Sequence, residues 1–163
     1  MMQTFLKFLY LLSLAFWIGS IFFFSLFTAP SIFKVLPRET AGELISNIFP
    51  QYYMVAYACG GLAIISSILL WVMGNSLSAA TNGIRIGILI VMLGLATYAG
   101  VTVRHRALEA RAEMRTLVTN SPQYLEVKTR FDNIHRKSVV FNSIVFLLGM
   151  KKFRNIVENS KGR

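Results

Sequence analysis

The chain has 163 residues and a formal net charge of +10; 55% of its residues are hydrophobic and only 15% are charged. A soluble domain has about 45–50% apolar and about 25% charged residues, so this composition argues against one. In a soluble protein the basic balance would suggest nucleic-acid binding. No module of interleaved aromatic and basic residues is present, however, and basic flanks beside apolar segments are typical of membrane proteins. We therefore expect an integral membrane protein that contacts lipid, including anionic lipid, and no nucleic acid.

Four apolar segments follow one another along the chain, over about 5–33, 52–73, 84–103 and 131–150. A spanning helix needs roughly 20 apolar residues. The fourth segment is the shortest, because its charge-free part, Ser138–Met150, covers only about 20 Å at 1.5 Å per residue. It spans a bilayer only if flanking bases snorkel or the bilayer thins. The pattern predicts one all-α domain over 1–163, an integral membrane four-helix bundle.

The first segment has no charged side chain between Phe8 and Phe33. This is too long for the apolar region of a secretory signal, so we interpret it as a retained span. Pro30 falls late in it and is expected to kink or end the helix. The connector that follows predicts a short interfacial helix over about 37–49, with Pro37 in its first turn and Glu39 near its positive end. Pro50 is expected to begin the second span as a new helix.

The second and third apolar segments are joined by a short polar turn, Gly74–Gly83, that contains no charge. Cys59, the only cysteine of the chain, lies within the second segment. A single cysteine excludes an internal disulfide and a cysteine metal cluster. We interpret it as a small packing residue.

The region between the third and fourth segments, about 104–137, is charged but helical in pattern. Apolar residues recur at alternating spacings of three and four on both sides of Asn120–Pro122, which indicates two helices with matching seams. The seam positions are Val103, Ala107, Ala110, Met114 and Leu117, then Tyr124, Val127, Phe131, Ile134, Ser138, Phe141, Val145 and Leu148. Ser121 is suited to cap the second helix, with Pro122 at its first position. The third and fourth helices are therefore expected to leave the membrane as one antiparallel hairpin.

Two histidines and two polar residues at the base of this hairpin are candidate site residues. His135, Ser138 and Asn142 share one side of the fourth segment and are expected to form a polar strip that faces the bundle, because a buried amide in lipid needs a partner on another helix. His105 and His135 lie at similar height and are weak candidates for a bis-histidine metal site. The seam register directs His105 outward, which argues against this pairing.

Three stretches resemble the membrane domain family that includes transmembrane protein 205 of animals and many uncharacterised bacterial proteins. They are "FWIGSIFFFSLFTAPSIF", "PRETAGELISNIFPQYY" and "FDNIHRKSVVFN", in that order along the chain. The connector positions that carry the resemblance are Pro37, Arg38, Glu39, Gly42, Phe49, Pro50 and Tyr52.

The resemblance implies a four-helix membrane fold without a settled biochemical activity. More distantly, the chain is similar to the copper-resistance protein D superfamily, whose members use intramembrane histidines. The stretch "LYLLSLAFW" lacks the histidine that begins the first helix there.

No nucleophile elbow, phosphate loop, carboxylate pair or metal-ligand cluster is present in the sequence. The acidic residues lie outside the apolar segments or at their edges, which argues against a proton-coupled pump. We predict a non-enzymatic protein of the bacterial inner membrane without a cofactor, an accessory subunit that binds other membrane proteins or itself. The alternative is a haem- or copper-handling protein with His135 as ligand.

The distribution of basic residues predicts the orientation in the membrane. The connector and hairpin contain Lys34, Arg38, Arg104, Arg106, Arg111, Arg115, Lys128, Arg130, Arg136 and Lys137. The opposite side has Lys7, Arg85, Lys151, Lys152, Arg154, Lys161 and Arg163. Positive charge near spans favours the cytoplasm, so the hairpin is expected to face inward.

Overall fold

The computed structural model of the chain describes residues 1–74 and 77–161, except for the side chains of 153 and 155–161. The described elements are all helical. In chain order they are α1 (Met2–Phe23), a π-helical segment (Phe24–Thr28), α2 (Ala29–Val35), α3 (Arg38–Val72), α4 (Ala79–Tyr98), a second π-helical segment (Ala99–Val103), α5 (Arg104–Thr116) and α6 (Pro122–Lys161). The all-α class predicted from the sequence is confirmed.

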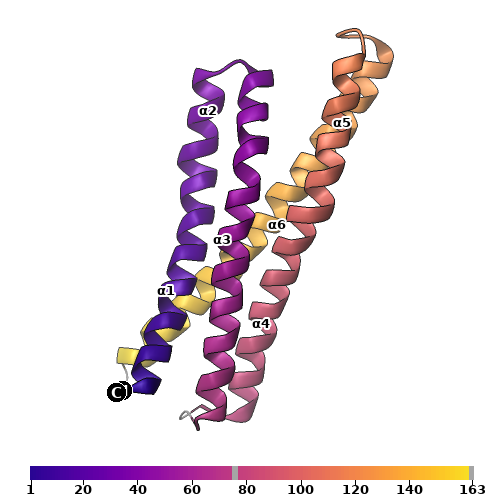
Figure 1. The fold of residues 1–163 in the computed structure, drawn as a ribbon. Helices are drawn as coiled ribbons and strands as arrows, with labels where there is room; N and C mark the ends of the chain where they lie inside the picture. Colours follow the sequence, from indigo (N-terminus) through magenta and orange to yellow (C-terminus); the bar gives the residue numbers. More distant parts are fainter. Residues whose placement is uncertain (75–76, 162–163) are drawn as a thin grey trace.

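The helices form an elongated bundle in which the chain passes four times along the long axis (Figure 1). α1 and α2 lie beside α3, whereas α4 and α5 form one rod through the second π-helical segment. α6 packs against α5, crosses α4 and α1, and ends near the start of α1. The link at Leu36–Pro37 and the hairpin tip therefore share one end of the bundle, and the hairpin extends past the ends of α2 and α3.

Three of the described helical stretches are long and apolar enough to cross a membrane: Met2–Val35, Arg38–Val72 and Ala79–Thr116. Only 33%, 33% and 28% of their most apolar windows is buried inside the bundle. Most residues of these windows are therefore exposed or half-buried on the surface of the bundle, as expected of helices surrounded by lipid. The chain is thus a multi-pass integral membrane protein. α6 runs the length of the bundle, but its apolar part is short, and its crossing of the bilayer stays a prediction.

The connector differs from the sequence-based expectation in two respects. The first helix does not end at Pro30: a π-helical segment ends two residues before this proline, and α2 continues past it to Leu36, whose backbone is extended. A kink at Pro30 stays a prediction. The separate interfacial helix over 37–49 is also wrong, because α3 continues from Arg38 through Pro50 without interruption.

Aromatic packing explains why α3 continues through Pro50. The proline removes one backbone hydrogen bond. Phe49, Tyr52 and Tyr53 on its two sides contact one another, and Phe24 of the first π-helical segment packs on Phe49 and Tyr52 with ring centroids 5.7 and 5.0 Å apart. These contacts hold the turns before and after Pro50 in register.

The core depends on glycines that allow large rings to approach neighbouring helices. Trp17 of α1 is 1% exposed and lies over Gly60 of α3, where an added Cβ would be 3.0 Å from its ring. Gly100 in the second π-helical segment gives similar room to the Tyr53 ring, which would lie 2.8 Å from an added Cβ. Close packing at small residues is a common means of helix association in membranes.

The shared end of the connector and hairpin makes the predicted orientation testable. Because this end has more basic residues than the other, a reporter inserted at Asn120 is expected to be cytoplasmic. Green fluorescent protein should fluoresce there, and alkaline phosphatase should be inactive. The reverse pattern, compared with the same reporters inserted at Ser78, would show that the hairpin faces outward.

Candidate functional site

The hairpin of α5 and α6 has the seam that the sequence predicted. Ala110 and Val127 are buried, and the remaining seam positions between Ala107 and Ile134 are half-buried. The chain reverses at Asn120, whose φ is +66°, and Ser121 accepts a hydrogen bond from the Tyr124 backbone N–H at 3.1 Å. The predicted cap at Ser121 and the start of α6 at Pro122 are confirmed.

Arg111 connects the hairpin to the first turns of α3. Its Nη1 donates a hydrogen bond to Ser46 Oγ at 2.9 Å, and its guanidinium lies 5.4 Å from the centroid of the Phe131 ring. The same guanidinium rests on Gly42, where any Cβ would overlap it. Gly42 is therefore needed for contact between α3 and Arg111. Arg111 thereby contacts both α3 and α6, and we call this arrangement the Arg111 clamp.

Ion pairs extend the same junction toward the Leu36–Pro37 link. Arg115 lies 3.8 Å from a carboxylate oxygen of Glu39 and 3.5 Å from one of Glu43. All three side chains are exposed, so each pair contributes little by itself. Together with the Arg111 clamp they join the C-terminal half of α5 to the first turns of α3.

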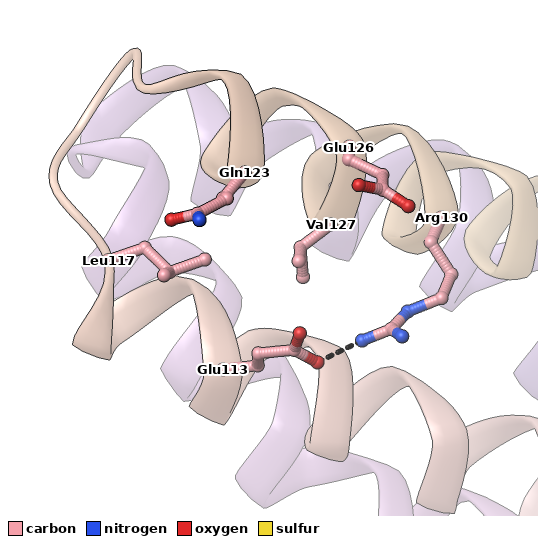
Figure 2. A pocket seen from close by; sticks show the side chains of 6 residues that line it. All are labelled: Glu113, Leu117, Gln123, Glu126, Val127 and Arg130. Atoms are coloured by element: carbon pink, nitrogen blue, oxygen red, sulfur yellow. Dashed lines mark hydrogen bonds and ion pairs between the residues drawn. The ribbon is translucent and has the colours of Figure 1, made fainter.

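A groove opens between the two arms of the hairpin near its tip (Figure 2). Its volume is about 380 Å³, and it is lined by Glu113, Leu117, Gln123, Glu126, Val127 and Arg130. Leu117 and Val127 supply apolar surface, while Glu113 is paired with Arg130 across the arms. Among the described residues Glu126 has no ion pair. The groove thus offers apolar surface beside one carboxylate that is available to a ligand.

The predicted polar strip is only partly directed into the bundle. Ser138 is half-buried and interacts with the Tyr53 hydroxyl of α3, and Asn142 is half-buried. His135 is exposed and stacks on Phe131, with ring centroids 6.4 Å apart. The expectation that His135 points into the bundle is wrong, because it lies one residue beyond seam position Ile134, on the outer flank of α6.

His105 is also exposed, with 73% of its side chain accessible, and its Nδ1 lies 3.3 Å from Glu109 on the same helix. Among the described interactions, none joins the His105 side chain to the His135 side chain. No group of three or more His, Cys, Asp or Glu side chains gathers within the described part of the chain. Haem or copper binding at His135 stays a prediction from the sequence.

Sequence reasoning missed Arg111 and Arg115, which it counted only as basic charges. The connector contained a signal that could have pointed to these two arginines. One face of α3 carries Glu39, Gly42 and Glu43 at helical spacing. Two acids beside a glycine predict a close basic neighbour on that face. The partner itself was not predictable, because it lies more than 60 residues away along the chain.

One known family matches a stretch of the chain that includes most of the helices described above. Residues 12–116 match the family described as "Domain of unknown function (DUF4149)". The matched stretch exceeds half of the chain and extends from α1 to the end of α5. The chain belongs to this family. Membership in the transmembrane protein 205 and copper-resistance protein D families is not shown.

One similar protein is described as "Uncharacterized protein" and comes from Aquifex aeolicus (strain VF5). It is 38% identical over 51 residues, which are 31% of this chain and 39% of that protein. The match therefore spans well under half of the relative's length. No solved structure matches the chain.

Proposed function

We propose that this protein is a non-enzymatic subunit of a membrane complex and that the groove at the hairpin tip binds its partner. The observation that carries the proposal is the groove itself: it lies on a hairpin that extends past the ends of α2 and α3, and it has Glu126 beside apolar surface. The proposal places the protein in the bacterial inner membrane. The bacterial source of the similar protein supports this localisation.

The rigidity of the hairpin supports a binding role. Its two arms are packed along a continuous seam, capped at the turn by Ser121 and joined to α3 by the Arg111 clamp. A surface that is ordered before binding loses less conformational entropy when a partner binds. A long loop that served only to join two spans would not need this construction.

The groove fits an amphipathic helix of another membrane protein, with a lysine or arginine next to apolar side chains. Glu126 supplies the charge complement for the basic residue. An amphipathic helix that docks its apolar face into a groove is a recurrent mode of recognition.

Photo-crosslinking in intact cells tests this proposal. A photoreactive amino acid at Gln123, inside the groove, is expected to crosslink one membrane protein. The crosslinked segment is expected to be an amphipathic helix with a lysine or arginine next to apolar side chains. The same amino acid at Thr129, which is exposed on α6 but does not line the groove, is the matched control. Lipid alone, a second copy of this chain, or identical products at both positions would contradict the proposal.

A further inference from the structure

A second groove lies on α6 at the base of the hairpin, apart from the groove at the hairpin tip. Its volume is about 340 Å³, and it is lined by Asn133, Arg136, Lys137, Val140 and Phe141. Asn133 and Val140 are seven residues apart and lie on one line along the helix, and the adjacent Arg136 and Lys137 lie on either side of that line. The groove therefore has basic sides, a polar end toward the hairpin tip and an apolar end away from it.

The two bases of this groove are available to an anion. Arg136 and Lys137 are both exposed, and the ion pairs and side-chain hydrogen bonds of the described residues join other side chains. Asp132 precedes Arg136 by one helical turn but does not line the groove. Positive charge without an acidic partner inside the groove is the complement of an anionic ligand.

The groove lies at the level expected for lipid headgroups. Lys137 is the last charged residue before the charge-free part of α6. Tyr53 interacts through its hydroxyl with Ser138, and the Tyr98 ring contacts the Phe141 ring edge-on, with centroids 5.5 Å apart. Tyrosines gather where membrane meets water, so these two rings mark that boundary beside the groove.

An apolar stripe continues from the groove along the same face of α6. Val140, Ile144 and Leu147 are 48%, 39% and 64% exposed and follow one another at spacings of four and three. Residues at these spacings are neighbours on a helix surface, and the stripe is about 10 Å long. A basic groove above an exposed apolar stripe matches a ligand with an anionic head and an apolar chain.

We propose that this groove binds an anionic phospholipid. The phosphate oxygens accept hydrogen bonds from Arg136, Lys137 and the Asn133 amide, and one acyl chain lies along the stripe from Val140 to Leu147. Arginine holds a phosphate through paired N–H groups, and lysine adds a point charge. Basic pockets beside membrane helices are suited to anionic headgroups on the cytoplasmic side, where the distribution of bases places this groove.

A role in membrane orientation alone would explain the charge of Arg136 and Lys137, because bases flank spans for that reason. It requires neither a groove between these side chains nor an amide at its polar end. A bound phospholipid accounts for the groove, the amide and the apolar stripe together. This site shares no residue with the groove at the hairpin tip, so either can fail without the other.

Native mass spectrometry of the full-length protein in an uncharged detergent tests the proposal. The probes are phosphatidylglycerol, phosphatidylcholine and glycerol phosphate, which is the anionic headgroup without acyl chains. Phosphatidylglycerol is expected to form a one-lipid adduct at lower concentration than phosphatidylcholine, and glycerol phosphate is not expected to displace it. Equal binding of both lipids, or displacement by glycerol phosphate, would overturn the proposal.

Three single substitutions of exposed bases locate the site. Arg136→Gln and Lys137→Gln are each expected to weaken phosphatidylglycerol binding about fivefold and to leave phosphatidylcholine binding unchanged. Arg106→Gln removes the same charge from the other arm of the hairpin, outside the groove, and is expected to change binding less than about twofold. Equal effects of Arg106→Gln and Lys137→Gln would reduce the interaction to general surface charge and overturn the proposal.

The same spectra distinguish a lipid from a second copy of the chain in the groove. The double variant Arg136→Gln/Lys137→Gln is expected to lose the one-lipid adduct and to keep the oligomeric state of the unchanged protein. Its melting temperature in detergent alone should stay the same, because exposed substitutions rarely alter folding. Loss of a dimer with an unchanged lipid adduct would assign the groove to a second copy and contradict the proposal.

Discussion

Replacing Gly60 with alanine is expected to lower the free energy of unfolding by about 1–3 kcal/mol, the usual cost of overpacking a core. The added Cβ would lie 2.9 Å from Leu93 Cδ1 and 3.0 Å from the Trp17 ring. Trp17 is almost fully buried, so its ring has no open space to enter. Unfolding of the detergent-solubilised protein by sodium dodecyl sulfate measures the change.

Gly61→Ala is the matched control, because the neighbouring glycine of the same helix has no atom within 4 Å of its added Cβ. This variant is expected to be neutral or more stable by up to about 1 kcal/mol, because alanine favours helix more than glycine. Equal destabilisation by both substitutions would mean that α3 does not pack on Trp17 in this register.

Gly42→Ala is expected to lower the free energy of unfolding by about 1–2 kcal/mol, the combined scale of a charge-assisted hydrogen bond and a cation–π contact. The new methyl group would occupy the position of the Arg111 guanidinium. Arg111 must then leave Ser46 and the Phe131 ring. The same unfolding titration measures the change.

A double-mutant cycle isolates this contact. Once Arg111 is replaced by alanine, Gly42→Ala is expected to become neutral or slightly stabilising, because nothing remains for its methyl group to displace. Arg106→Ala, at an exposed position on the same helix, should leave the cost of Gly42→Ala unchanged. Additive effects of Gly42→Ala and Arg111→Ala would disprove the Arg111 clamp.

The hairpin could be predicted from the sequence because each of its determinants is local. The three–four spacing of apolar residues defines both seams, and Ser121–Pro122 define the start of α6 through the geometry of a helix cap. Burial of Ala110 and Val127 follows directly from that spacing. The position of the turn then determines which residues of α5 and α6 face each other.

Features that depend on contacts between distant segments could not be predicted. Pro50 is a helix breaker by local rules, and the packing of Phe24 on Phe49 and Tyr52 overrides that tendency. Arg85 is a single basic residue at the edge of an apolar segment, which by itself does not predict that it is buried. It is buried because α1 and α3 bring Tyr10 and Ser67 beside it.

A charge exchange at Glu126 tests partner binding at the hairpin groove most directly. Glu126→Lys is expected to abolish the photo-crosslink from Gln123, because it places a like charge opposite the basic residue of the partner. Changing that partner residue to glutamate is expected to restore the crosslink in the Glu126→Lys background. An undiminished crosslink from Gln123 in the Glu126→Lys variant, or no recovery after the exchange, would contradict recognition through this carboxylate.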